Sequence, residues 1–181
     1  MKRAARPAVA IDLVIKSGRW RTKRTSGAAI RRAVARAATV TSTINGELAV
    51  VLTNDSAVRA LNRQWRGINA PTNVLSFPSA HTGGYLGDVV LAYETIAREA
   101  RAEHKPFAHH LAHLAIHGFL HLIGYDHQHD RDAIRMERAE RKILRQLAIP
   151  DPYRPRLEAP PRRAARKRAA TLRGGTAKRE A

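Results

Sequence analysis

The residues with the clearest chemical meaning in this chain lie in one short segment, from His117 to His127. His117 and His121 are four positions apart, so on a helix they project from the same face, with Cβ atoms about 6 Å apart. Gly124 can adopt a positive φ and end that helix, which brings His127 to the same side. Three neutral imidazoles with an open fourth position are the ligands of a catalytic zinc site. The spacing therefore predicts a centre for one metal ion held by His117, His121 and His127.

Three imidazoles favour zinc, although nickel, cobalt, manganese or copper can occupy such a site in vitro. Zinc makes hydroxide available at neutral pH, and hydroxide can attack a carbonyl carbon or a phosphorus. The spacing H-x-x-x-H-x-x-G-x-x-H is that of the metzincin peptidases, in which a general-base glutamate follows the first histidine. Gly118 occupies that position here. The sequence thus contains the metal ligands of such a peptidase without its base.

Five other histidines lie near this segment: His104, His109, His110, His113 and His129. We expect His113, one turn before His117, to make a hydrogen bond beside the ligands or in the core. His109 and His110 are expected near the surface, and His129 is expected to face solvent just past the turn.

Cleavage of a phosphodiester needs cations that hold the anionic substrate and its transition state. Arg66, which leads into a loop, is the candidate cation, although an ordinary exposed arginine is the alternative from residue type alone. Asp126 can orient a ligand imidazole or cap the next helix. Asp88 lies in an apolar strand and can be a partner of a ligand or a strand-end residue facing water. His113, Asp126 and Asp88 are therefore the candidates for supporting the metal ligands.

Hydrophobic periodicity predicts an α+β fold, in which one mixed sheet of about four strands packs with helices in a single domain. The predicted strands cover residues 9–15, 46–53, 73–77 and 86–92. The predicted helices cover residues 26–38, 55–65, 94–104, 107–123 and 130–148. The helix at 107–123 is apolar around most of its surface, which indicates a buried central helix resembling the active-site helix of metzincins.

Two of these helices have features that the structure can test. Asn54, Asp55 and Ser56 offer candidate N-cap residues for the helix that runs through Trp65. The last helix is predicted to pair Glu137 with Arg141. Its buried stripe is predicted to consist of Ala133, Met136, Ile143 and Leu147.

The formal net charge of +18 is concentrated at the two ends of the chain. Residues 1–36 hold 11 Lys or Arg against one acid, residues 37–150 hold 12 against 11, and residues 151–181 hold 10 against three. Such ends attract polyanions in a salt-sensitive way, or they form a solubilising Arg/Ala tail. We predict a basic N-terminal extension at 1–7, a folded domain at 8–150, and a basic, disordered tail at 151–181.

Composition indicates a cytoplasmic protein. The chain has no cysteine, which excludes disulfide partners, thiolate metal ligands and a cysteine nucleophile. The basic start is followed by a short apolar stretch interrupted by Pro7 and Asp12, so no signal peptide is predicted. No run approaches the ~20 apolar residues that span a bilayer, so no membrane partner is expected.

Four segments together resemble the YbeY family of bacterial rRNA maturation endoribonucleases. They are the run from His117 to His127, Arg66-Gly67, Thr72-Asn73-Val74-Leu75-Ser76-Phe77-Pro78 and Leu86-Gly87-Asp88-Val89. The resemblance covers about residues 8–150, which implies a zinc metallo-hydrolase domain. It implies a zinc-dependent, single-strand-specific endoribonuclease that matures the 3′ end of 16S rRNA and acts in late ribosome quality control. It further implies His117, His121 and His127 as zinc ligands and Arg66 as the cationic residue of the substrate cleft, while His113 matches a family histidine without an assigned role.

Three functional hypotheses remain open. The first is the endoribonuclease, with either water or the RNA 2′-hydroxyl as nucleophile. The second is a ribosome-assembly binding factor whose metal is mainly structural. The third is a metallopeptidase, against which Gly118 argues. The expected partners are rRNA and the small ribosomal subunit, with a ribosomal protein and an assembly GTPase as further candidates.

Overall fold

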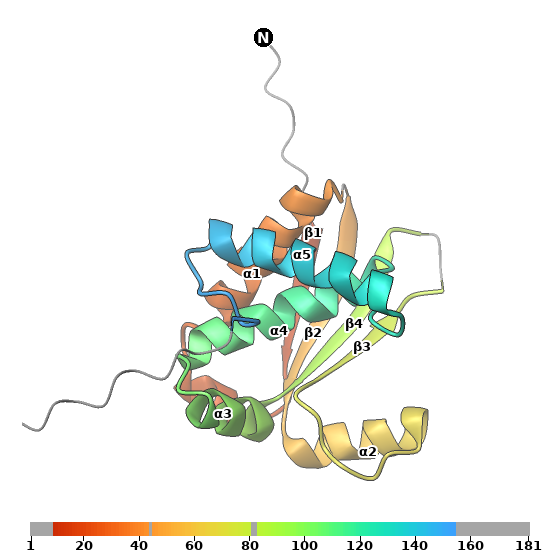
Figure 1. Cartoon of the computed structure of the whole chain (residues 1–181). Coiled ribbons are helices and arrows are strands. Elements are labelled where there is room, and N and C mark those ends of the chain that lie inside the picture. The colour runs from red at the N-terminus through yellow and green to blue at the C-terminus, as the bar shows by residue number, and fades with distance from the viewer. Residues whose placement is uncertain (1–8, 44, 81–82, 155–181) are drawn as a thin grey trace, which may run out of the picture.

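A computed structural model describes residues 9–43, 45–80 and 83–154, which form one mixed four-stranded sheet with helices on both faces (Figure 1). The strands are β1 (Val9–Ile15), β2 (Gly46–Thr53), β3 (Val74–Pro78) and β4 (Tyr85–Ala92). The helices are η1 (Gly18–Thr22, a 3₁₀ helix), α1 (Ser26–Thr41), α2 (Asp55–Arg66), α3 (Tyr93–Ala102), α4 (Phe107–Leu122) and α5 (Asp130–Gln146). The predicted α+β fold is confirmed. The extension predicted at 1–7 and most of the tail predicted at 151–181 lie outside the described residues.

Helix ends account for most differences between the predicted and observed elements. α1 runs three residues further than predicted and stops where Ser42 adopts a φ of 56°. α3 and α5 each end two residues earlier than predicted, before His104 (φ 50°) and Ala148 (φ 57°). A positive φ cannot continue a right-handed helix. Of the three candidate caps of α2, Asn54 is the one that caps the helix, because the Ala57 N–H donates to Asn54 Oδ1 at 2.9 Å.

The 3₁₀ helix η1 was not predicted, because five residues are too few to show a helical period. It carries Trp20, which is only 2% exposed. The Trp20 indole N–H donates to the Thr53 carbonyl at 2.8 Å, and the ring packs edge-on against Tyr93. η1 is thereby attached to the end of β2.

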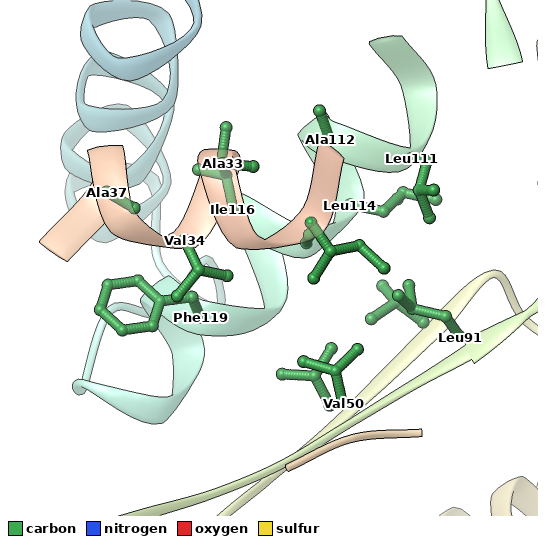
Figure 2. Packing of buried hydrophobic residues seen from close by; sticks show 14 of the residues in the cluster. Ala33, Val34, Ala37, Val50, Leu91, Leu111, Ala112, Leu114, Ile116 and Phe119 are labelled. Carbon is green, nitrogen blue, oxygen red and sulfur yellow. The ribbon is translucent and has the colours of Figure 1, made fainter. Parts of the chain in front are cut away.

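The strand order is β1-β2-β4-β3, with β3 at one edge. β1, β2 and β4 are parallel, while β3 runs antiparallel to β4. α1 and α4 cover one face of the sheet, and α5 packs across them (Figure 1). On that face Val34 and Phe119 pack above Val50 and Leu91 (Figure 2). α2 covers the opposite face through Val58, so the sheet separates α2 from α4.

α4 packs closely against the sheet at Gly118. A Cβ atom at this position would lie 2.6 Å from Val89 Cγ1 and 3.3 Å from Ser76 Oγ. Any side chain at residue 118 would therefore be directed into the sheet. At the position where metzincin peptidases have a glutamate, this chain has a glycine that allows the helix to contact the sheet.

We predict that Gly118→Ala lowers the free energy of unfolding by about 1 kcal/mol. Crowding against the stiff, buried Val89 costs about 1–3 kcal/mol, and the better helix propensity of alanine returns about 1 kcal/mol. Thermal or urea unfolding measures the change. Gly18→Ala is the control, because a Cβ at Gly18 meets no atom within 4 Å. Gly118→Ala should cost less in a Val89→Ala background, and a Gly118→Ala protein as stable as wild type would show that the helix can move away freely.

Candidate metal centre

Three imidazoles meet at the C-terminal end of α4 and in the turn that follows it. His117 and His121 lie on one face of α4, with their Nε2 atoms 3.2 Å apart. The His127 ring is stacked against that of His117, with centroids 5.5 Å apart, and lies 4.9 Å from the His121 ring. One ring nitrogen of each histidine lies within 4.8 Å of those of the other two. The structure thus brings together the three residues that the spacing singled out.

The turn after α4 is held by the main chain. Gly124 has a φ of 87°, and its N–H donates to the His121 carbonyl at 3.1 Å. The Tyr125 N–H donates to the Leu120 carbonyl at 3.0 Å. Asp126 Oδ1 accepts the His127 N–H at 2.7 Å. Gly124 therefore reverses the chain as predicted, and Asp126 contacts the backbone of the third histidine.

The donor set fits a divalent cation. Metal–nitrogen bonds of about 2.0–2.1 Å in a tetrahedral site place two ligand nitrogens about 3.3 Å apart, close to the observed Nε2 separation. Burial, together with the neighbouring charges of His117 and His127, lowers the pKa of His121 to about 4. His121 is therefore neutral at pH 7, and the neutral imidazole is the form that binds a metal.

A buried carboxylate on α5 holds the first of these imidazoles. Glu140 is fully buried, and its Oε1 lies 2.8 Å from His117 Nδ1. This contact leaves His117 Nε2 directed at the other two histidines. Glu140 Oε2 lies 3.1 Å from His113 Nε2 and accepts the hydroxyl hydrogen of Tyr153. A carboxylate on the outer nitrogen of a metal-binding imidazole fixes both the tautomer and the ring orientation.

The same contacts keep Glu140 ionised. Burial alone would raise its pKa, but the hydrogen bonds from His113, His117 and Tyr153 lower the pKa to about 2. Burial and the neighbouring Glu140 carboxylate in turn raise the pKa of the Tyr153 hydroxyl. The site therefore includes a carboxylate behind the three imidazoles that is negatively charged at neutral pH.

The sequence analysis did not identify Glu140. Of the predicted stripe on the last helix, Met136, Ile143 and Leu147 are buried and Ala133 is partly buried. Glu140 lies on that same stripe, and an acid at an apolar position was the signal that could have found it. The predicted pair of Glu137 and Arg141 is confirmed at 3.3 Å.

Arg66 lines the same cleft as the three histidines. The cleft has a volume of about 740 Å³. It is formed by the end of α2, the loop before β3, one face of β3 and the turn after α4. Its lining includes Arg66, Thr72, Asn73, Ser76, Pro78, His117, His121, Asp126 and His127. Arg66 and Asp126 thus share the cleft with the candidate ligands.

One of the sequence candidates, Asp88, lies elsewhere. Asp88 is paired in register with Ala49, and alternation along β4 places it on the same sheet face as Val90, which packs against α2. Its Oδ1 accepts the Tyr85 hydroxyl at 2.9 Å, so the structure does not bring Asp88 to the histidines.

The expectation that His110 is near the surface is wrong. His110 is 6% exposed, and its Nε2 lies 2.8 Å from Glu99 Oε2.

Fold and site together define an α+β protein with a candidate three-imidazole metal centre in an open cleft. A family model described as Endoribonuclease YbeY matches residues 16–148. The chain is 52% identical over 157 residues to Endoribonuclease YbeY of Nitrobacter hamburgensis, covering 81% of this chain and 83% of the relative. It is 50% identical to the protein of that name from Bradyrhizobium diazoefficiens, covering 78% and 84%. The chain therefore belongs to the Endoribonuclease YbeY family, which confirms the resemblance in its motifs.

The chain is also similar to a solved structure. The solution structure of a Thermotoga maritima protein matches with a TM-score of 0.48 and 21% sequence identity. The match covers 80% of this chain and 99% of that protein.

We predict that Glu140→Gln removes a pH-dependent part of the stability. Because the folded-state pKa of Glu140 lies below its ordinary value of 4.5, the ionised carboxylate stabilises the fold above about pH 4.5. That contribution is lost as the pH falls from about 4.5 through about 2. In chelator-treated protein, the free energy of unfolding of wild type should exceed that of Glu140→Gln. This difference, the stability gap, should narrow by on the order of 2 kcal/mol between about pH 6 and about pH 3. Urea unfolding at each pH measures the gap.

The control for this prediction is Glu137→Gln, on the same helix. Glu137 forms a partly exposed pair with Arg141, so its gap to wild type should stay below about 1 kcal/mol at both pH values. A Glu140→Gln gap that does not change with pH would contradict the low pKa of Glu140.

Proposed function

We propose that this chain is a zinc-dependent endoribonuclease that cleaves single-stranded RNA. The observation that carries the proposal is that three imidazoles suited to a metal ion and the guanidinium of Arg66 line one cleft. Membership of the Endoribonuclease YbeY family supports it. We further propose that the substrate is the 3′ end of 16S rRNA in late small-subunit precursors in the cytoplasm.

Each residue has a defined task in this proposal. His117, His121 and His127 hold one zinc ion, which when bound supplies Lewis-acid chemistry at a phosphodiester. Glu140 accepts the hydrogen on His117 Nδ1 and so keeps Nε2 directed into the cleft. Arg66 stabilises the negative charge that develops on the phosphoryl oxygens as the linkage is cleaved. Asp126 fixes the main chain that carries His127.

The charge of the chain suits an RNA substrate. The net charge of +18 attracts phosphate backbones, and such binding weakens steeply with salt. Within the described part of the chain, no helix is both long and apolar enough to cross a membrane. We propose the small ribosomal subunit as the binding partner, together with a ribosomal protein and an assembly GTPase.

Gly118 argues against the peptidase hypothesis for a structural reason. A glutamate at this position would enter the space occupied by Val89 and would be directed at the sheet. The cleft therefore has no place at residue 118 for the base that a metzincin peptidase uses. The alternative hypothesis, an assembly factor whose metal is mainly structural, is tested by the cleavage experiment below.

We predict that the purified chain binds one zinc ion through the three histidines. His127→Ala should weaken zinc binding by more than about 100-fold, because loss of even an outer partner of a ligand costs about 10- to 100-fold. His129→Ala is the matched control, an exposed histidine on the same turn. Competition with a chromophoric chelator measures the affinity. Equal affinity in the two variants would exclude His127 as a ligand.

We predict that the protein cleaves a single-stranded 16S rRNA 3′-end precursor, and that chelation stops the cleavage until zinc is added back. His121→Ala should abolish cleavage. Arg66→Ala should lower kcat by about 10²- to 10³-fold, as expected when a group that stabilises transition-state charge is lost. Zinc content of the Arg66→Ala protein should be unchanged. The control is Arg138→Ala, which removes an exposed arginine of α5.

The outcomes of this experiment separate the hypotheses. Cleavage that persists in His121→Ala would reveal a contaminating nuclease. Absence of cleavage by zinc-loaded wild type, with binding to pre-ribosomal particles retained, would favour the assembly factor. End-group analysis identifies the nucleophile, since attack by the RNA 2′-hydroxyl leaves a cyclic phosphate and attack by water does not.

A further inference from the structure

The last turn of α2 presents an aromatic ring to solvent beside the catalytic cleft. Trp65 is 65% exposed, although tryptophan is among the largest apolar side chains. It directly precedes Arg66, which lines the cleft. Ile68, in the loop that follows, is 53% exposed. This exposed surface of Trp65 and Ile68 makes no contribution to the core and has no part in the metal centre.

The Trp65 ring and the candidate ligands lie on opposite faces of strand β3. It packs edge-to-face on Phe77, with ring centroids 5.9 Å apart. Phe77 belongs to the apolar cluster beneath α2, whereas its neighbours Ser76 and Pro78 line the cleft on the other face of β3. β3 is an edge strand, and among the residues that the structure describes no further strand pairs with its outer side. An extended chain that leaves the cleft over this edge reaches Trp65 directly.

The segment that carries Trp65 is held in place. Gly67 has a φ of 72°, and its N–H donates to the Arg63 carbonyl at 3.1 Å. Asn62, only 4% exposed, donates from Nδ2 to the Ala70 carbonyl at 2.8 Å and so ties the loop to α2. Arg59 Nε donates to Asn69 Oδ1 at 2.8 Å. The ring is therefore displayed on an ordered support, which lowers the entropy cost of binding.

The charge around the ring favours a nucleic acid over a protein. Arg63 and Arg66 are exposed, and within the described residues no carboxylate pairs with either of them. Asp55, the only acid on α2, lies at the other end of the helix and binds Thr95 and Arg98. An exposed aromatic ring flanked by unpaired arginines is complementary to a ligand with both bases and phosphates.

We propose that Trp65 is a stacking subsite for a nucleobase of single-stranded RNA, at a nucleotide next to the linkage held in the cleft. The inference rests on the proposed function and extends it to how substrate is recognised. Stacking on an aromatic ring tolerates any base, because every base has a π-face. A base in a duplex is already stacked and paired, so this subsite selects for single strands without reading sequence.

The chain provides its own probe for this contact. It contains two tryptophans, and Trp20 is 2% exposed, so a bound base can quench only Trp65. The experiment titrates zinc-free protein, in chelator, with a short single-stranded RNA and with the same backbone carrying abasic residues. Anisotropy of the labelled RNA measures affinity, and tryptophan fluorescence reports stacking. Chelation keeps the RNA intact, so the result does not depend on whether the protein cleaves it.

The variants separate stacking from charge. Wild type should bind the RNA with bases at least about fivefold more tightly than the abasic strand, with quenching. Trp65→Phe should keep most of this difference, and Trp65→Ala should abolish it while abasic binding stays the same. Ile134→Ala, which truncates a 49% exposed side chain on α5, should match wild type.

Two results would overturn the inference. One is a Trp65→Ala protein that still discriminates bases from abasic positions. The other is a Trp65→Ala protein that binds RNA as tightly as wild type but binds pre-ribosomal particles weakly. That result would make Trp65 a protein-docking residue. Failure of the proposed function itself would look different, because zinc-loaded wild type would then leave RNA uncleaved while the Trp65-dependent difference in affinity persisted.

Discussion

The close approach of α4 to the sheet at Gly118 sets the geometry on which the rest of the molecule depends. Because residue 118 has no side chain, the helix can lie against Val89 and Ser76. The neighbouring residue, His117, is then level with the cleft, while Ile116 and Phe119 fill the core against α1. One helix can in this way be both the centre of the core and the support of the candidate metal centre. A larger residue at 118 would raise the helix and move both functions together.

The second requirement is electrostatic. Three imidazoles packed together repel one another when protonated, and burial near His117 and His127 keeps His121 neutral. Glu140 balances this cluster from behind, where it contacts His113, His117 and Tyr153. A buried carboxylate is costly unless each oxygen is hydrogen-bonded, and here both oxygens are. α5 is therefore bound to α4 by the same contacts that orient a candidate ligand.

The two faces of the edge strand β3 contact different parts of the proposed RNA-binding surface. Ser76 and Pro78 line the cleft beside the histidines, while Phe77 supports Trp65 on the opposite face. Arg66 reaches the cleft from the end of α2, the helix that covers that opposite face. Arg66, the three candidate metal ligands and the Trp65 ring thus come from separate segments that lie around this edge. The arrangement suits a strand of RNA that runs over the edge of the sheet.

The sequence by itself determined the local features. The i, i+4 spacing and a glycine-terminated helix brought His117, His121 and His127 together. Alternation and capping identified four strands and five helices, with bounds within a few residues of those observed. Such patterns can be read from the sequence because they depend on short-range geometry. Only the tertiary structure decided which distant residues face these histidines. Glu140 reaches His117 because α5 packs over α4, whereas Asp88 is turned away by the alternation of β4. His110 is buried because α3 supplies Glu99. These outcomes depend on how separate helices and strands pack against one another, and no single segment encodes that packing.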